Sequence, residues 1–220
     1  LPARGVWPAA TRAAPMRPWF KALPLSAMPG SALIRGEFRV PDRGSPDFAA
    51  MALACAMLDD LILGRLRGTD GLAEGAWTRL ADDAPSASVT VYKTPNPRAA
   101  KAAVDGAIAE LSAGLCRDLG DAGWALGPVE RSLEAYKSRA IAASYSRGAS
   151  SQGMAASIAS DLAAGGDGTA LFRMEGRIRA VSAADLVRVA RQRLLEGPSA
   201  WIALGDPELV AGLPLSAFIH

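Results

Sequence analysis

The sequence predicts an α+β fold: one mostly antiparallel or mixed sheet with helices packed on one of its faces. Two observations favour this class. Some segments alternate apolar and polar residues, which is typical of strands with one solvated face, whereas others carry apolar residues at helical spacing. In addition, two predicted strands follow each other directly, without an intervening helix. With 50% apolar and 21% charged residues among 220, the chain is able to bury a substantial core.

The first predicted strand is SALIRGEFRV, residues 31–40. Ile34 and Phe38 fall on one face, and Arg35 and Glu37 fall on the other. A helix is predicted over 46–63, with Ser45 as its N-cap and a proline at its first position. Because this helix is apolar on nearly every side, we expect it to be packed on at least two sides.

Two strands at about 72–80 and 86–94 predict a hairpin. Asn96 and Pro97 then begin a helix whose buried stripe includes Val104 and Leu111. The sequence predicts a loop over 116–127.

Further helices are predicted over 128–146 and 151–163, the second capped by Ser150. Ser182 and Asp185 form a capping box for a last helix, which Gly197 and Pro198 end. A short strand follows in SAWIALGD.

We divide the chain into a linker or arm at 1–29 that lies on the domain, a domain at 30–212 and a tail at 213–220. The chain begins with Leu, which favours a processed chain or a piece of a longer one. The N-terminus has no signal-peptide pattern, because prolines interrupt its apolar residues. No run of 18 apolar residues predicts a membrane span.

Several kinds of chemistry are disfavoured. The net charge of +2 does not indicate a nucleic-acid groove. His220, the last residue, is the single histidine, so no imidazole is placed for a zinc site or a general base. Cys55 and Cys116 fit either small buried apolar positions or a disulfide.

Other polar and aromatic side chains have ordinary explanations. Acidic pairs at 59–60 and 82–83 suit solvated helix ends and turns better than a metal site. Tyr136 and Lys137 fit one helix with Tyr inward and Lys outward. Trp77 and Trp124 suit a core or an interface.

Four stretches together resemble a known family. They are SALIRGEFRVPDRGSPDFAAMALACAMLDD, RLRGTDGLAEGAW, LEAYKSRAIAA and IRAVSAADLVRVARQRL with WIALGD, in this order over roughly residues 30–206. They are similar to the C-terminal, non-zinc-binding half of pitrilysin/insulinase-type zinc metallopeptidases, the inverzincins. The resemblance implies a half-domain of the LuxS/processing-peptidase kind. One departure is Leu58-Asp59-Asp60, where the family has Leu-Gly-Gly.

The resemblance also implies which residues matter. In the family, an Arg and a Tyr seven residues apart bind the substrate carbonyl near a zinc ion held by HxxEH in the other half. Arg67 matches that Arg, with Arg65 as the alternative alignment, and Glu74 stands at the Tyr position. Because an ionised Glu only accepts hydrogen bonds, it cannot donate to a carbonyl, and it could pair with Arg67 instead. The ordinary alternative is a solvated turn, in which Gly71 supplies a positive φ.

The resemblance therefore predicts a non-catalytic half of a zinc endopeptidase. Such a half closes the substrate chamber and helps bind peptide for a zinc-binding partner half, in the same chain or in a separate subunit. Alone it would be inactive: we assign it no catalytic residue and no metal ligand, and expect zinc only in the partner. The alternatives are a scaffold protein like the respiratory core proteins and, third, an unrelated enzyme that uses carboxylates. We expect a periplasmic location, with the cytoplasm as the alternative.

Overall fold

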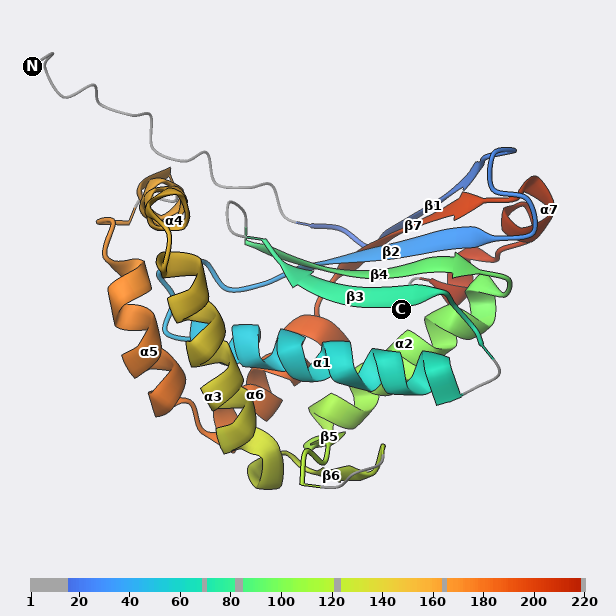
Figure 1. The fold of residues 1–220 in the computed structure, drawn as a ribbon. Coiled ribbons are helices and arrows are strands. Elements are labelled where there is room, and N and C mark those ends of the chain that lie inside the picture. The colour runs from blue at the N-terminus through green and yellow to red at the C-terminus, as the bar shows by residue number, and fades with distance from the viewer. Residues whose placement is uncertain (1–15, 69–70, 82–84, 121–123, 164–165, 219–220) are drawn as a thin grey trace, which may run out of the picture.

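The protein, studied as a computed structural model, is described at residues 16–68, 71–81, 85–120, 124–163 and 166–218, without the side chains at 67, 68 and 147. One twisted sheet lies over a layer of helices, with α7 at one end and α4 at the other (Figure 1). The predicted α+β class, with one mixed sheet covered by helices on one face, is confirmed.

The main sheet has five strands in the order β1-β7-β2-β4-β3. Their bounds are β1 Trp19–Pro24, β2 Ala32–Arg39, β3 Gly75–Leu80, β4 Ser86–Thr94 and β7 Ser199–Gly205. β1 pairs with β7 in parallel, and the other pairs are antiparallel. The predicted hairpin is therefore present as β3 and β4, and β3 is an edge strand.

The helices account for most of the remaining described chain. Their bounds are α1 Phe48–Gly68, α2 Pro97–Ser112, α3 Val129–Gly148, α4 Ser151–Ala163, α5 Ala170–Ala180, α6 Ala183–Ala190 and α7 Pro207–Val210. A π-helical turn at Arg191–Leu195 continues α6, and a 3₁₀ turn lies at Leu215–Ala217.

The predicted capping residues act at the helix starts. Asn96, Ser150 and Ser182 each accept a hydrogen bond from the backbone N–H three residues later, at 3.0–3.1 Å. Asp185 completes the capping box by accepting from the backbone of Ser182. Ser45 accepts from the N–H of Asp47, but α1 begins only at Phe48, so Ser45 lies in the turn before the helix and is not its N-cap as predicted. Local side chains thus define where these helices start.

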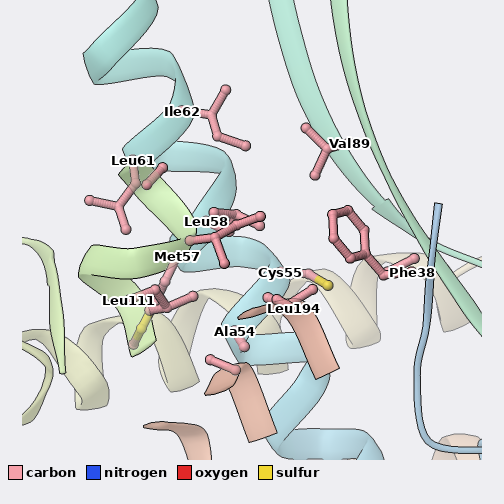
Figure 2. Packing of buried hydrophobic residues seen from close by; sticks show 14 of the residues in the cluster. Phe38, Ala54, Cys55, Met57, Leu58, Leu61, Ile62, Val89, Leu111 and Leu194 are labelled. Atoms are coloured by element: carbon pink, nitrogen blue, oxygen red, sulfur yellow. The ribbon is translucent and has the colours of Figure 1, made fainter. Parts of the chain in front are cut away.

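Helix α1 lies at the centre of the core, between the sheet and the other helices. Its residues Cys55, Leu58 and Ile62 are at most 4% exposed. Figure 2 shows them between Phe38 and Val89 of the sheet and apolar residues of the neighbouring helices. Burial on several sides confirms the prediction made from the nearly uniform apolarity of this helix.

Part of the predicted arm belongs to the sheet. Residues 19–24 form β1, which pairs with β7. The predicted tail also packs on the domain, because Phe218 is fully buried and its ring stacks on Phe20 at 4.2 Å between centroids. Neither feature has a local signal, since both depend on partners far along the chain.

Two further elements differ from the prediction. The expected loop at 116–127 contains two short paired strands, β5 Leu115–Arg117 and β6 Leu126–Pro128. Helix α5 was not predicted as a separate element, although it is amphipathic and places Met174 and Ile178 in the core. Three-residue strands lie below the length at which alternation is detectable.

Helix α1 is longer than predicted and runs through residue 68 instead of ending near 63. Gly64 lies within the helix, which continues and buries Leu66. The Trp124 ring packs against this glycine, since a Cβ here would lie only 2.3 Å from the ring. The two arginines at 65 and 67 therefore belong to the last turns of α1 and not to a loop. Trp124 itself is 45% exposed and lies over Arg117, so it is not a core residue.

Candidate functional site

The predicted site lies where the end of α1 leads into β3. Residues 69–70 and the Arg67 side chain are outside the described part of the chain. The backbone of Arg67 is in the last turn of α1. Gly71 has φ +68°, as its predicted turn role requires. Whether Arg67 and Glu74 face one ligand remains a prediction.

Glu74 lies just before β3, and its partner is Lys93 at the end of β4. The Lys93 Nζ is 3.1 Å from Glu74 Oε2. The two come together because the hairpin register places Gly75 opposite Tyr92. The hydrogen bond that Lys93 donates to the Glu74 carboxylate raises the pKa of Lys93. Both side chains are exposed, so the pair contributes little to stability.

Lys93 also has an unusual backbone, with φ +51° at a residue that is not glycine. This conformation is uncommon for an L side chain and is found where the surrounding structure holds it. Together with Glu74, Tyr92 and Gly71, Lys93 lines a hollow of about 660 Å³, and the turn at 27–31 also lines it. Lys93 and Tyr92 were not predicted as site residues, because only the register of β3 and β4 places them beside Glu74.

Arg65, the alternative to Arg67, is held on another side of the molecule. It donates from Nε to Glu110 Oε2 at 2.9 Å and from a terminal nitrogen to the second carboxylate oxygen. This two-point contact joins α1 to α2 over Gly106, where a Cβ would lie 2.6 Å from the guanidinium. The hydrogen bond to Glu110 raises the pKa of Arg65. Its engagement with Glu110 leaves Arg67 as the better candidate for ligand contact.

The acidic residues at the middle of α1 have structural partners. Asp59 accepts a hydrogen bond from the backbone N–H of Thr78 at 2.5 Å, and burial raises its pKa. Asp60 accepts from the Tyr136 hydroxyl at 2.6 Å. No group of three His, Cys, Asp or Glu in the described segments could hold a metal ion. The acids at 82–83 lie outside those segments.

Tyr136 and Lys137 both point inward. Tyr136 is 2% exposed, as predicted, but the prediction of an outward Lys137 is wrong, because this residue is 7% exposed. The Lys137 Nζ donates to Glu134 at 2.8 Å and to the Arg179 carbonyl at 3.1 Å. A long apolar stem allows a lysine to be buried when its ammonium group finds such acceptors.

Cys55 and Cys116 are free and buried, so the alternative of a disulfide is excluded. Burial raises the pKa of Cys55 to about 12 and that of Cys116 to about 11. Both thiols are therefore protonated near neutral pH and act as small apolar groups. Trp77, by contrast, is 44% exposed on the face of the sheet opposite the helices, near Tyr92.

No protein-family model matches the sequence, and no curated protein matches it significantly. Solved structures share its fold. The inactive peptidase domain of a proposed zinc protease from Bordetella parapertussis matches with a TM-score of 0.63 and 21% identity, over 79% of this chain and 91% of that one. A peptidase M16 inactive domain from Pseudomonas fluorescens matches with a TM-score of 0.63 and 16% identity, over 86% of this chain and 43% of that one.

The periplasmic protease PqqL from Escherichia coli also matches, with a TM-score of 0.61 and 14% identity, over 87% of this chain and 21% of that chain. The chain thus spans nearly all of one short neighbour and a half or less of the longer ones. None of the described helices is long and apolar enough to cross a membrane. The chain has the fold of the C-terminal, inactive half-domain of the pitrilysin/insulinase-type, or M16, zinc peptidases.

Proposed function

We propose that this chain is the non-catalytic half of a zinc metalloendopeptidase. It forms one wall of a substrate chamber and helps bind peptide for a separate half that carries HxxEH. One observation carries the proposal: the fold matches an inactive peptidase domain over 91% of that domain's length, while the sequence contains no HxxEH and a single, terminal histidine. Zinc belongs to the partner half in this proposal, and this chain needs no cofactor of its own.

The open face of the sheet supports a role as a wall. Helices cover the other face, which holds the core (Figure 1). The open face carries aromatic and basic side chains that are exposed: Trp19, Lys21, Arg35, Trp77, Arg79 and Tyr92. Exposed aromatic residues beside arginines are typical of surfaces that bind other polypeptides. We therefore place the substrate and the partner half on this side.

Complex formation tests the proposal directly. This chain, carrying an affinity tag, is co-expressed with an HxxEH-bearing half-domain from the same organism. We expect the two halves to co-purify in a stoichiometric complex through size-exclusion chromatography. Recovery of the two proteins in separate fractions at micromolar concentrations would contradict the proposal.

Arg67 is the residue we propose for contact with the substrate carbonyl. Its guanidinium is permanently charged and has five N–H donors. In the reconstituted peptidase we expect Arg67→Ala to lower kcat/KM by about 10- to 100-fold, since the loss of a charged donor costs on the order of 1.5–3 kcal/mol. Arg65→Ala is the matched control, because Arg65 is held by Glu110, and we expect it to leave kcat/KM within about twofold.

The scaffold alternative remains a distinct outcome of the same experiment. It is favoured by Glu74, which stands where a phenol donor is expected and which pairs with Lys93. If Arg67→Ala leaves kcat/KM unchanged in an active complex, the chain holds the complex together and does not assist in catalysis. We also propose a periplasmic location, which the similarity to a periplasmic protease supports.

A further inference from the structure

A groove runs beside the free edge of β3. It has a volume of about 350 Å³ and lies between the edge strand and helices α1, α3 and α5. Much of its helical wall consists of alanines, at positions 52, 56, 140 and 143. Because alanine has the smallest apolar side chain, these helix faces leave space next to the strand instead of closing over it.

The backbone of β3 is presented to this groove. In an antiparallel pair, alternate residues bond to the neighbouring strand, and the others point their N–H and C=O groups to the opposite side. The N–H of Thr78 is directed away from β4, because it donates to Asp59 on α1. By the same alternation, the backbone groups of Leu80, which also lines the groove, face this edge.

Asp59 shows which ligand group the edge accepts. Its carboxylate oxygen lies 2.5 Å from the Thr78 nitrogen, where a carbonyl oxygen of an added strand would lie. The Thr78 hydroxyl oxygen is also buried and has no hydrogen-bond partner among the described residues. The edge thus offers the Thr78 N–H, whose present acceptor Asp59 could be replaced by a ligand. It also offers the Thr78 hydroxyl, which has no hydrogen-bond partner among the described residues.

The chemistry around the edge specifies the side chains of the ligand. A strand added beside β3 would place alternate side chains on its two faces. One set would point toward the alanines, Phe48 and Met174 of the groove. The other set would lie on the open face beside Trp77 and Arg79, both exposed. The exposed guanidinium of Arg79 favours acidic residues in this second set.

We propose that the β3 edge and this groove bind an extended peptide strand in which apolar residues alternate with acidic ones. The strand adds to the sheet through the backbone of Thr78 and Leu80, and a peptide carbonyl replaces Asp59 on the Thr78 N–H. This mode obtains affinity from main-chain hydrogen bonds and specificity from alternate side chains. The inference deepens the proposed function, since it names a second place where a substrate or partner segment is held.

Binding of a defined peptide to the isolated full chain tests this inference. The probe is a fluorescein-labelled nonapeptide of alternating Val and Glu, followed by fluorescence anisotropy, with an alternating Val and Lys peptide for comparison. We expect saturable binding of the Glu peptide and at least about tenfold weaker binding of the Lys peptide. Absence of saturable binding, or equal binding of the two peptides, would overturn the proposal.

Two exposed alanines on α3 provide a matched pair of variants. Ala143 lines the groove, whereas Ala142 is exposed on the same helix and does not. Ala143→Trp fills the groove, so we expect it to weaken peptide binding at least about tenfold. Ala142→Trp should change the dissociation constant less than about twofold. Equal effects of the two substitutions would show that the peptide binds elsewhere.

A further variant examines the strand edge itself. Asp59→Ala releases the Thr78 N–H and removes a negative charge, so we expect several-fold tighter binding of the Glu peptide. Unchanged or weaker binding would contradict the replacement of Asp59 by a peptide carbonyl. Sedimentation of the chain without peptide identifies a competing occupant: self-association that Ala143→Trp abolishes would assign the edge to a second copy of the chain. These measurements need no zinc-binding half, so their failure is distinguishable from failure of the proposed function.

Discussion

Two arginine side chains connect the turn before α1 to helices α5 and α6 through hydrogen bonds. Arg188 of α6 donates two hydrogen bonds to the Asp47 carboxylate, at 2.7 and 3.1 Å. Arg177 of α5 donates to the Arg43 carbonyl at 2.9 Å and to the Ser45 carbonyl. The hydrogen bonds from Arg188 lower the pKa of Asp47 below its ordinary value of 3.8. These contacts join segments that are far apart in the sequence.

The Asp47–Arg188 pair predicts a defined dependence of stability on pH. The unfolded chain binds a proton at Asp47 near pH 3.8, and the folded chain binds it only at lower pH. The stabilisation is therefore complete above about pH 5 and is lost as pH falls through the folded pKa. We expect Asp47→Asn to lower the free energy of unfolding by about 0.5–1 kcal/mol at pH 7 and by less near pH 3.

Urea unfolding of both proteins between pH 7 and pH 3 measures this difference. Asp42→Asn is the control, because Asp42 is an exposed carboxylate of the same turn. A difference between Asp47→Asn and the parent that stays constant down to pH 3 would contradict the assignment of the lowered pKa to this pair.

The candidate site shows what residue types alone could predict. The positive φ of Gly71 and the inward Tyr136 were predicted, because each follows from local conformation or helical spacing. The pairing of Glu74 with Lys93 was missed, since it arises from the register of two strands. Lys137 was predicted wrongly, because its acceptor, the carbonyl of Arg179, comes from another helix.

The contact between β2 and β7 depends on one glycine. Gly36 lies opposite Trp201 in the register of these strands. A Cβ at Gly36 would lie 2.5 Å from the Trp201 ring, which is 1% exposed and is enclosed by Phe38, Phe218 and Lys101. The Lys101 ammonium lies 4.6 Å from the ring centroid and pairs with Asp105. The ring therefore has little room to move.

We predict that Gly36→Ala destabilises the fold by about 1–3 kcal/mol, because it overpacks this rigid contact. Thermal unfolding followed by circular dichroism measures the change. Gly44→Ala is the matched control, since no atom lies within 4 Å of its added Cβ, and we expect the melting temperature to change by about 1 °C or less. Equal melting temperatures for the parent and Gly36→Ala would refute the proposed packing.

Secondary structure was predictable wherever a local signal marks an element. Caps at Asn96, Ser150 and Ser182 identified helices α2, α4 and α6, and the alternation in β2 and β4 identified two of the central strands. By contrast, β1 depends on pairing with β7, and β5 and β6 depend on each other. The end of α1 was placed too early because the sequence does not reveal that Leu66, beyond Gly64, is buried in the core.

The buried core and the accessible polar and aromatic groups lie on different sides of the sheet. Helices and one face of the sheet form the core, whereas the open face and the β3 edge leave aromatic, basic and backbone groups accessible. The described segments hold no cluster suited to a metal ion. The role proposed above, holding a polypeptide beside a metal site of another half-domain, uses these accessible groups.

Reconstitution of peptidase activity tests this account most directly. A fluorogenic peptide is incubated with the HxxEH-bearing half, with this chain, and with both, and the bound zinc is measured in each sample. We predict that this chain alone binds no stoichiometric zinc and cleaves nothing, and that adding it to the zinc-binding half raises the cleavage rate at least about tenfold. Stoichiometric zinc with proteolysis by this chain alone, or an unchanged rate after mixing, would contradict the account.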